Sequence, residues 1–503
     1  MDERAQPAPL GFAWQVKGAD GVITRLSPII FVIGVLLCGL SVLLILPIIA
    51  DLVTGSPTLG PFVISLVITT FFGVAFLLAA RQSRDFALDV RQAFILTAAS
   101  WLVLSSFSAL PFLGIGVDFT DAYFETVSGL TTTGSTVLTG LDTMSPGILL
   151  WRSELQWAGG VGIVVMAIVL LPFLRVGGMQ LFRTESSDNS ERIVPNAFSL
   201  MSWIIGIYAG LTILCALGYI ATGMSTFDAI CHAMTTLSTG GYSTHDASFG
   251  FFEAPAAEWI AIVFMLAGAV PFVMYIRFLQ GDRAAPVRDP QAKSLVLFVV
   301  VVALITALWL VPHLHDNFGH AFRSSLFHIV SIVTTTGYAT TDYTLWGPFV
   351  VGIFFMLMFV GGCAGSTAGS IKIYRHQVIF VVIRTQLLRL SGPHRVARPQ
   401  YNGAPIPADV PSSVLAFIAL FFVLVGLFTV ALTAYGLDLV TALSASATAM
   451  ANVGPGFGDV IGPAGNFQSL PAGAKWLLSF EMLLGRLEIF TLLLMLDPQF
   501  WRR

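Results

Sequence analysis

Charged side chains are scarce in this sequence. Only 11% of its 503 residues are Asp, Glu, Lys or Arg, whereas 56% are hydrophobic. A soluble domain carries about 25% charged residues, so this chain has too few charges to cover a water-facing surface. The composition excludes a soluble globular protein and predicts an integral membrane protein in contact with lipid. The net charge of −3 gives no indication of a nucleic-acid partner.

Cysteines and enzyme motifs are also sparse. The four cysteines are scattered and form no CxxC pair, which argues against a disulfide framework or a thiolate metal site. The sequence contains no Walker motif, dinucleotide fingerprint or HExxH string. We therefore expect neither enzyme activity nor a bound cofactor, and any control by nucleotides has to come from another chain.

Long hydrophobic runs are abundant instead. A spanning helix needs about 20 apolar residues, and among long runs only helices satisfy their backbone groups within lipid. The runs predict an all-α polytopic membrane protein with ten spans. These are 28–50, 60–80, 92–114, 148–173, 197–222, 257–279, 293–313, 347–370, 411–435 and 474–496.

Lysine and arginine gather in alternate loops. The loops on one side are basic, whereas the opposite loops hold only Arg323, with Arg152 and Lys475 at helix entrances. By the positive-inside rule, both termini are expected to be cytoplasmic. The long opposite loops are then extracytoplasmic.

Each of the four long extracytoplasmic loops carries a polar segment with glycine. The segments are LTTTGST at 130–136, TLSTGGYST at 236–244, VTTTGYAT at 333–340 and ANVGPGFG at 451–458. Alignment on the first glycine of each segment pairs Gly134, Gly240, Gly337 and Gly454, about 100 residues apart. The spacing predicts a fourfold internal repeat.

Every polar segment follows a stretch that is able to form a short helix. The four stretches are 119–130, 226–237, 321–333 and 438–450. Twelve residues of helix rise only about 18 Å, so such a helix enters a bilayer without crossing it. The predicted unit is span, half-helix, polar turn and span, four times in one orientation.

Non-helical backbone at membrane depth is tolerated only when it is buried in protein or lines a water-filled path. A single segment of this kind is more readily an ordinary surface turn, but four copies in register favour one shared path. Their carbonyl oxygens would then replace the hydration shell of a weakly hydrated monovalent cation. The expected filter residues are Thr132, Thr133, Gly134, Ser238, Thr239, Gly240, Thr335, Thr336, Gly337, Asn452, Val453 and Gly454.

Four further stretches carry a resemblance to a known family. They are WRSELQWAGGVGIVVMAIVLLP at 151–172, GGMQLFRTESSD at 177–188, FVGGCAGSTAGSIKIYR at 359–375 and MLLGRLEIFTLLLML at 482–496. With them, the whole chain resembles the TrkH/KtrB/HKT superfamily of potassium transport proteins, and most closely its bacterial TrkH branch. The resemblance implies K⁺ bound at the filter residues, a homodimer, a cytosolic nucleotide-binding TrkA-type subunit, and a place in the bacterial cytoplasmic (inner) membrane.

The filter departs from the channel consensus TVGYG. Only the first glycine recurs in all four copies, and the fourth copy has Asn452 and Val453 where the others have Ser or Thr followed by Thr. A less uniform filter should discriminate potassium from sodium less well than a symmetric channel. This remains a hypothesis about the pore.

The eighth span is interrupted by GGCAGSTAGS at 361–370. Gly361, Gly365 and Gly369 stand four apart, which suits close helix packing. Alternatively, small residues on every face weaken the helix, and the chain unwinds into an intramembrane loop. The resemblance implies that this loop is a gate. The basic, amphipathic segment 371–392 follows it directly and is well placed to carry the motion of a cytosolic partner to the loop. The expected gating residues are Gly361, Gly362, Cys363, Ala364, Gly365, Ser366, Thr367, Ala368, Gly369 and Arg486.

Arg486 lies inside the last predicted span. An arginine at that depth costs roughly 2.5–3.5 kcal/mol on insertion scales. An ion pair with Glu481 or Glu488 is one interpretation, but neither has the spacing of a same-helix partner. The other is a fixed charge below the filter, which opposes cations or hydrogen-bonds to the gate, and the resemblance places an arginine there.

The sequence thus predicts two N-terminal helices followed by four pore repeats around a pseudo-fourfold pore. The expected segments are 1–27 (cytosolic), 28–84 (two extra spans), 85–194, 195–290, 291–400 and 401–503 (repeats one to four). The expected function is potassium uptake through the filter, with the gate under control of a cytosolic subunit. A potassium–proton or potassium–sodium symporter with the same pore is the alternative, although the spans offer few carboxylates for a relay.

Overall fold

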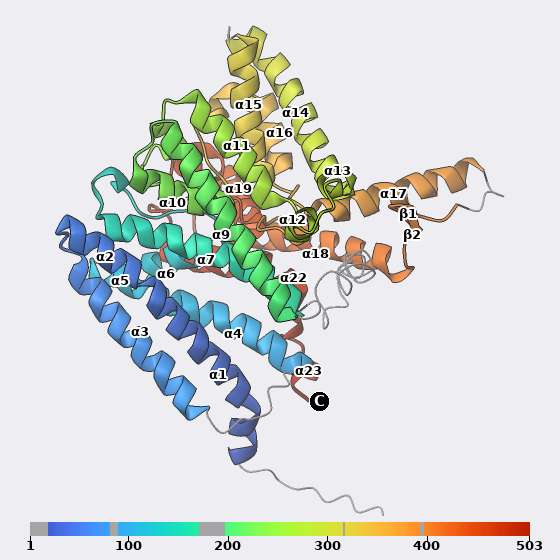
Figure 1. Ribbon diagram of the computed structural model, residues 1–503. Coiled ribbons are helices and arrows are strands. Elements are labelled where there is room, and N and C mark those ends of the chain that lie inside the picture. The colour runs from blue at the N-terminus through green and yellow to red at the C-terminus, as the bar shows by residue number, and fades with distance from the viewer. Residues whose placement is uncertain (1–18, 81–88, 171–196, 315–316, 393–396, 503) are drawn as a thin grey trace, which may run out of the picture.

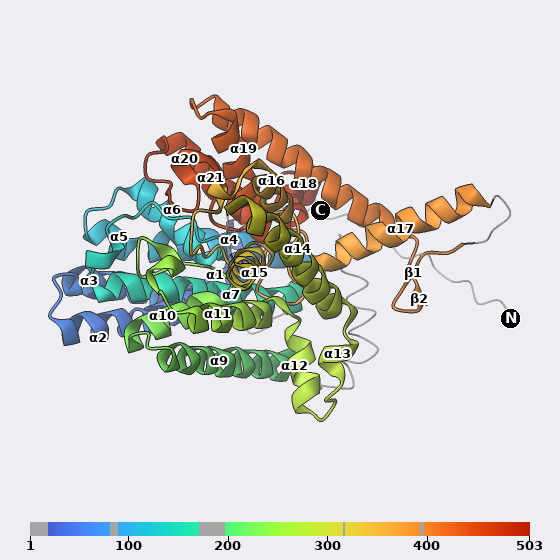
Figure 2. The same ribbon diagram turned by 90° about the horizontal axis from the view of Figure 1, so that it is seen from above.

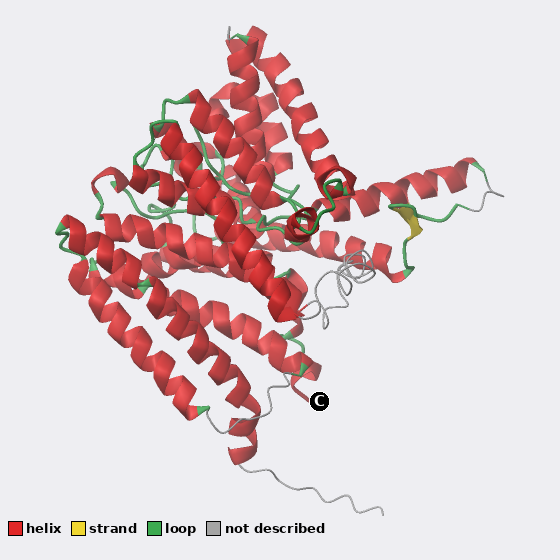
Figure 3. Cartoon of the chain, viewed as in Figure 1, coloured by secondary structure: helices red, strands yellow, loops and turns green. Residues whose placement is uncertain are grey.

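The computed structural model describes residues 19–80, 89–170, 197–314, 317–392 and 397–502. Helices make up nearly all of the regular structure in these ranges (Figure 3), which confirms the all-α prediction. The motif GGMQLFRTESSD and most of the predicted segment 1–27 lie outside the described residues.

The two N-terminal helices and the first repeat precede residue 171. Their elements are α1 (Ala19–Leu43), α2 (Ile45–Thr54), α3 (Leu59–Ala79), α4 (Val90–Ser108), α5 (Leu110–Gly114), α6 (Phe119–Leu130), the 3-10 turn η1 (Leu141–Thr143) and α7 (Pro146–Leu170). The second repeat contains α9 (Ala197–Ala221), α10 (Thr226–Leu237), η2 (Ser248–Phe251), α11 (Pro255–Ala269), α12 (Phe272–Leu279) and α13 (Ala285–Arg288). Helices α1 and α3 lie side by side at one edge of the molecule (Figure 1).

The third and fourth repeats complete the chain. The third contains α14 (Pro290–Leu314), α15 (Phe318–Val333), η3 (Tyr343–Trp346), α16 (Pro348–Leu357) and α17 (Ile373–Ser391). The fourth contains the strand pair β1 (Gln400–Tyr401) and β2 (Ala404–Pro405), then α18 (Asp409–Thr433), α19 (Leu439–Ala451), α20 (Gly458–Ile461), α21 (Ala472–Arg486), α22 (Ile489–Leu494) and α23 (Pro498–Arg502). Helix α17 projects away from the body in both views (Figures 1 and 2).

The short helices α6, α10, α15 and α19 coincide closely with the four predicted half-helices, and we call them the pore helices. Each begins at a residue whose side chain accepts a hydrogen bond from the first turn of the helix, which is the arrangement that N-cap residues favour. The four caps are Asp118, Ser225, Asn317 and Asp438. The polar caps fix where each pore helix starts.

Three of the predicted spans are broken. Within 257–279, α11 and α12 meet at an angle of 94°, because Pro271 has no N–H for the helical ladder and Val270 before it adopts extended backbone. Within 474–496, α21 ends at Arg486, and Glu488 has a φ of +58°. Continuous helices over these two ranges were wrong predictions.

The third break lies within 347–370. Helix α16 ends at Leu357, and the chain is non-helical until α17 begins at Ile373. The unwound alternative is therefore the correct one, and the break starts earlier than the glycine-rich stretch. Among the described residues, six helices are long and apolar enough to cross a membrane, and the bent pair makes a seventh.

Candidate functional site

The four pore helices end in the same backbone pattern. In the first turn, Thr132 N–H donates to Gly129 O at 3.0 Å, and Thr133 N–H donates to Ser128 O at 2.9 Å. The same two bonds, reaching three and five residues back, recur in the other turns. Their donors are Thr239 and Gly240, Thr335 and Thr336, and Asn452 and Val453.

The first donor of each pair lies in the left-handed region. The φ values are +52° for Thr132, +53° for Thr239, +59° for Thr335 and +55° for Asn452. Asparagine tolerates this conformation, but a β-branched threonine does so only under strain. Strain of about 1–3 kcal/mol per residue persists where the surrounding structure enforces it, and it clusters at functional sites.

Two residues further on, each turn has a glycine with positive φ. These are Gly134, Gly241, Gly337 and Gly454. A Cβ on any of them would collide with, or press closely on, a carbonyl oxygen of another turn. Gly134 faces Gly240 O, Gly241 faces Thr336 O, Gly337 faces Val453 O, and Gly454 faces Thr133 O.

These contacts run from the first turn to the second, third and fourth, and then back to the first. Four segments about 100 residues apart in the sequence therefore close into a ring. We call residues 132–134, 239–241, 335–337 and 452–454 the ring. Only glycine fits at the contact positions, because a side chain would enter the neighbouring carbonyl.

The ring corrects the predicted register of the second turn. Alignment on the first glycine of each segment assigned Ser238, Thr239 and Gly240 to the filter. The structure places Thr239, Gly240 and Gly241 in the equivalent positions, one residue later. Ser238 corresponds to Thr131, and both continue the right-handed helical backbone at the end of their pore helices.

A cavity of about 200 Å³ lies against one side of the ring, and we call it the vestibule. It is lined by the four glycines at the contact positions of the ring and by polar residues of the following loops, including Ser135, Tyr242 and His245. At its rim His245 Nδ1 lies 2.6 Å from Asp142 Oδ1. This hydrogen bond holds the pKa of Asp142 below its ordinary value.

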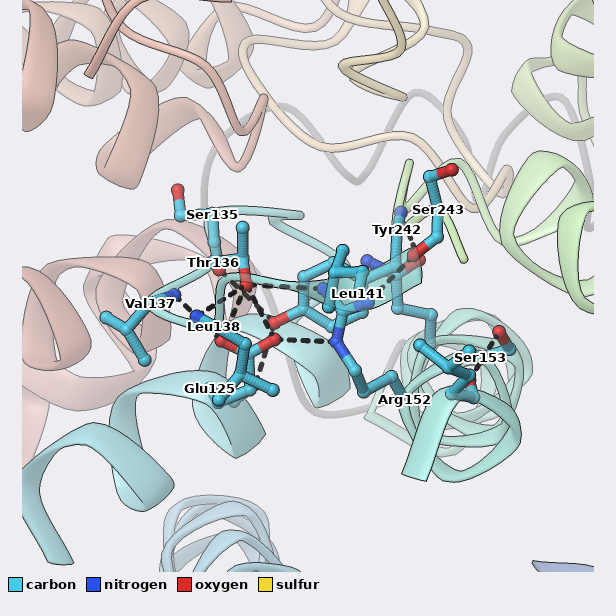
Figure 4. A network of polar contacts seen from close by, with 12 residues as sticks. Glu125, Ser135, Thr136, Val137, Leu138, Leu141, Arg152, Ser153, Tyr242 and Ser243 are labelled. Atoms are coloured by element: carbon cyan, nitrogen blue, oxygen red, sulfur yellow. Dashed lines mark hydrogen bonds and ion pairs between the residues drawn. The ribbon is translucent and has the colours of Figure 1, made fainter. Parts of the chain in front are cut away.

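A buried ion pair braces the ring on the vestibule side (Figure 4). Arg152 of α7 donates from Nε to Glu125 Oε1 of α6 at 2.9 Å, and from Nη1 to Ser243 O at 2.8 Å. Glu125 also accepts from Thr136 Oγ1 and Val137 N, and Tyr242 lies against the guanidinium. The pair ties the segment after the first turn to the segment after the second.

Removing one partner of this pair should destabilise the protein severely. Glu125→Ala leaves the Arg152 guanidinium buried without a counter-charge, which costs about 3–5 kcal/mol. We expect a clear drop in the melting temperature of the purified protein in detergent. The control is Asp282→Ala, which removes the partner of Arg288 in a pair whose side chains are 75% and 45% exposed. Equal melting shifts for the two variants would contradict a bracing role.

The unwound segment 358–372 lies against the opposite side of the ring, and we call it the loop. Its neck is closed by hydrogen bonds from Gly361 N to Ile371 O and from Ile373 N to Gly362 O. Lys372 Nζ donates to Ala368 O within it. Nearly all of the predicted gating residues in the loop are buried.

The loop contacts three of the four turns. Gly369 N donates to Thr335 Oγ1 at 2.7 Å, and Ser370 N donates to Ala451 O at 2.9 Å. Thr367 Oγ1 lies 3.2 Å from Thr239 Oγ1. In contrast, Thr132 Oγ1 is buried and has no hydrogen-bond partner among the described residues.

The break between α11 and α12 and an arginine on α21 hold the loop. Cys363 N donates to Ala269 O at 2.8 Å, and Phe272 N donates to Gly365 O at 3.1 Å. Arg486 Nη1 donates to Thr367 O at 2.9 Å. Arg486 therefore contacts the loop and forms no ion pair with Glu481 or Glu488 in the described structure; Glu488 binds Arg375 instead.

Sequence reasoning missed several residues around the ring. Gln156 contacts the second turn directly, and the Glu125–Arg152 pair was not expected. No role is predicted from the sequence for three further glycines, Gly159, Gly268 and Gly485. A Cβ on each would meet the carbonyl near the end of a pore helix, at Leu130, Leu237 and Met450 respectively. The glycine that recurs in the span after the first, second and fourth turns was the available signal.

Four equivalent re-entrant turns that close into a ring define a helical membrane transport protein. The chain belongs to the TrkH family, described as cation transport proteins, whose family model matches residues 60–502. These relatives are transport proteins and not enzymes.

Curated proteins and a solved structure agree with this assignment over nearly the whole chain. The Trk system potassium uptake protein TrkI of Halomonas elongata is 45% identical and covers 96% of this chain and 98% of its own length. TrkH of Vibrio parahaemolyticus is 36% identical, with 94% and 99% covered. The crystal structure of the potassium transporter TrkH from Vibrio parahaemolyticus superposes with a TM-score of 0.86 at 35% identity, covering 94% of this chain and 99% of that one.

Proposed function

We propose that this protein takes up K⁺ across the bacterial cytoplasmic membrane through the ring. The closed cycle of four glycine–carbonyl contacts carries the proposal, because it brings carbonyls of all four turns together. Similarity to proteins named as potassium uptake proteins supports the identity of the ion. The proposed K⁺ ligands are the carbonyls of the ring, with Gly241 added to the predicted set and Ser238 removed from it.

The pore helices suit a cation. Their carboxyl ends point to the ring, and a helix carries a partial negative charge of about half an elementary charge at that end. Net flux would follow the electrochemical gradient, and one charge that crosses 100 mV gains about 2.3 kcal/mol. The observed strain in three ring threonines is consistent with a pre-formed filter.

We propose that the loop is the gate. It lies against three of the four turns, and Arg486 holds its Thr367 carbonyl. A cytosolic TrkA-type subunit would move it through α17, which starts directly after the loop and projects from the body (Figure 2). We further propose a homodimer and cytoplasmic termini, on the resemblance and the distribution of basic residues.

Purified protein in liposomes tests this function. In liposomes loaded with K⁺, without any added ionophore, we expect uptake of a rubidium tracer. External K⁺ should compete with this uptake, and liposomes without the protein should show none. Bi-ionic reversal potentials should show a finite preference for K⁺ over Na⁺, below that of a fully symmetric channel. Absence of tracer flux in every condition, with and without a TrkA-type subunit, would refute the proposal.

Coupled symport is the second candidate, because two buried glutamates, on α7 and α21, have carboxylate oxygens without a hydrogen-bond partner among the described residues. Both oxygens of Glu154 on α7 lack a hydrogen-bond partner among the described residues, and so does Glu481 Oε2 on α21. Such groups are candidates for a proton relay. A reversal potential that shifts with the pH gradient or the Na⁺ gradient would favour this candidate, and one set by K⁺ alone would exclude it.

A further inference from the structure

We propose that Gln156 is a positioning residue that sets the ion selectivity of the second turn. This inference rests on the proposed function and extends it to a side chain outside the ring. Gln156 lies on α7, in the first repeat, and is fully buried. Its amide nevertheless bonds to the backbone of the second repeat, on both sides of Gly241.

Both ends of the amide are occupied. Gln156 Nε2 donates to Gly240 O at 2.7 Å, and Gln156 Oε1 accepts from Tyr242 N at 3.0 Å. An amide with its oxygen and nitrogen exchanged would satisfy neither group, so these two bonds assign its orientation. The side chain thus holds the peptide groups on either side of a ring glycine.

Gln156 also fills the place of a missing side chain. The residues equivalent to Gly240 are Thr133, Thr336 and Val453, which carry their own side chains. A Cβ on Gly240 would fall on the amide group of Gln156. The second turn therefore obtains from another helix the support that the other three turns contain within themselves.

This contact makes the ring unequal. Gly240 O accepts the Gln156 amide, whereas the equivalent carbonyls of Thr133, Thr336 and Val453 accept no hydrogen bond among the described residues. Ion preference depends on the number, position and field strength of the carbonyls that replace water. Two consecutive glycines are also the most flexible backbone in the ring. Loss of Gln156 should therefore free the Gly240 carbonyl for the ion and make the backbone around it more mobile. A stronger and more adaptable ligand favours the smaller Na⁺.

Gln156→Met keeps the length of the side chain and removes both hydrogen bonds. In liposomes we expect rubidium uptake to persist while the K⁺/Na⁺ permeability ratio falls about five-fold, the scale of one net hydrogen bond. The control is Ser153→Ala on the same helix, whose hydroxyl donates to Leu149 O of its own helix and has no hydrogen bond to the ring in the described structure. Its ratio should equal that of the unchanged protein.

A second test of the same contact combines substitutions at Gly240 and Gln156 and does not depend on Gln156→Met. Gly240→Thr alone should lose most uptake, because its side chain collides with Gln156. Gln156→Ala combined with Gly240→Thr should regain uptake, because the second turn then resembles the first and third. An unchanged permeability ratio in Gln156→Met, or an equal defect of Gly240→Thr in both backgrounds, would overturn the inference. Failure of the unchanged protein to conduct K⁺ would instead refute the proposed function.

Discussion

Gly241→Ala removes most potassium uptake while the protein still folds and reaches the membrane. Gly241 has a φ of +76°, and a Cβ there would run into Thr336 O of the third turn. The ring has to open or the peptide has to turn away, at a cost of about 3 kcal/mol. At about 1.4 kcal/mol per factor of ten, we expect uptake to fall about 100-fold in a strain that depends on this protein for K⁺.

Gly223→Ala is the matched control for backbone strain. Gly223 lies in the same repeat with a φ of +94°, but a Cβ there meets nothing within 4 Å. It therefore carries the conformational penalty of alanine without the collision in the ring, and we expect near-normal uptake. Comparable losses in the two variants would mean that strain alone, and not the ring contact, determines the effect.

Gly241→Ala also distinguishes the predicted register of the second turn from the observed one. If the filter were Ser238, Thr239 and Gly240, then Gly241 would follow the filter, and Gly241→Ala would lower uptake only slightly. In the observed register Gly241→Ala is severe, and Gln156→Ala does not rescue it, because its collision is with Thr336 O. Gly240→Thr is rescued by Gln156→Ala, because its collision is with that side chain.

The pore helices could be predicted from the sequence because local signals determine them. The Thr/Gly turns mark where they end, and a polar cap such as Asp118 marks where the first begins. The third is predicted from residue 321, whereas the Asn317 cap starts it at Phe318. The break at Val270–Pro271 was also signalled locally, by a proline inside an apolar run. The apolar run on both sides of the proline is together long enough to cross a bilayer, and its length alone predicts one continuous span.

The register of the second turn could not be derived from local sequence. Gly240 and Gly241 are adjacent, so either can be aligned with the single glycine of another turn. The choice depends on Gln156, which lies 84 residues away from Gly240 and takes the place of its side chain. Similarly, no local signal at Glu488 predicts that α21 ends beside it, since its positive φ accompanies a long-range pair with Arg375.

Arg486→Ala should raise potassium flux in the absence of the cytosolic subunit. In the described structure the arginine donates from Nη1 to Thr367 O, while Nε and Nη2 have no hydrogen-bond partner among the described residues. A hydrogen bond from a charged group is worth about 1.5–3 kcal/mol. Its loss should shift the gate toward the open state about ten-fold or more, measured as rubidium flux into liposomes without the subunit.

Two control variants test whether the lost hydrogen bond causes the higher flux of Arg486→Ala. Arg486→Lys keeps the charge but loses the planar fork of donors, so a gate held by hydrogen bonding should open partly. Arg323→Ala removes a half-buried arginine that pairs with Glu258 on α11, where it does not contact the loop, and it should leave flux unchanged. Unaltered or lower flux in a correctly folded Arg486→Ala protein would contradict the role of the arginine at the gate.

Deletion of 363–369 distinguishes a latch from an electrostatic barrier. The deletion removes Thr367 and should raise basal flux by itself, because the loop no longer lies against the second and third turns. If Arg486 acts only by holding the loop, then Arg486→Ala adds nothing to the deletion, since contacts within one unit are not additive. If its charge also opposes cations in the path, the two changes multiply, and the gain is larger at low ionic strength because salt screens the charge.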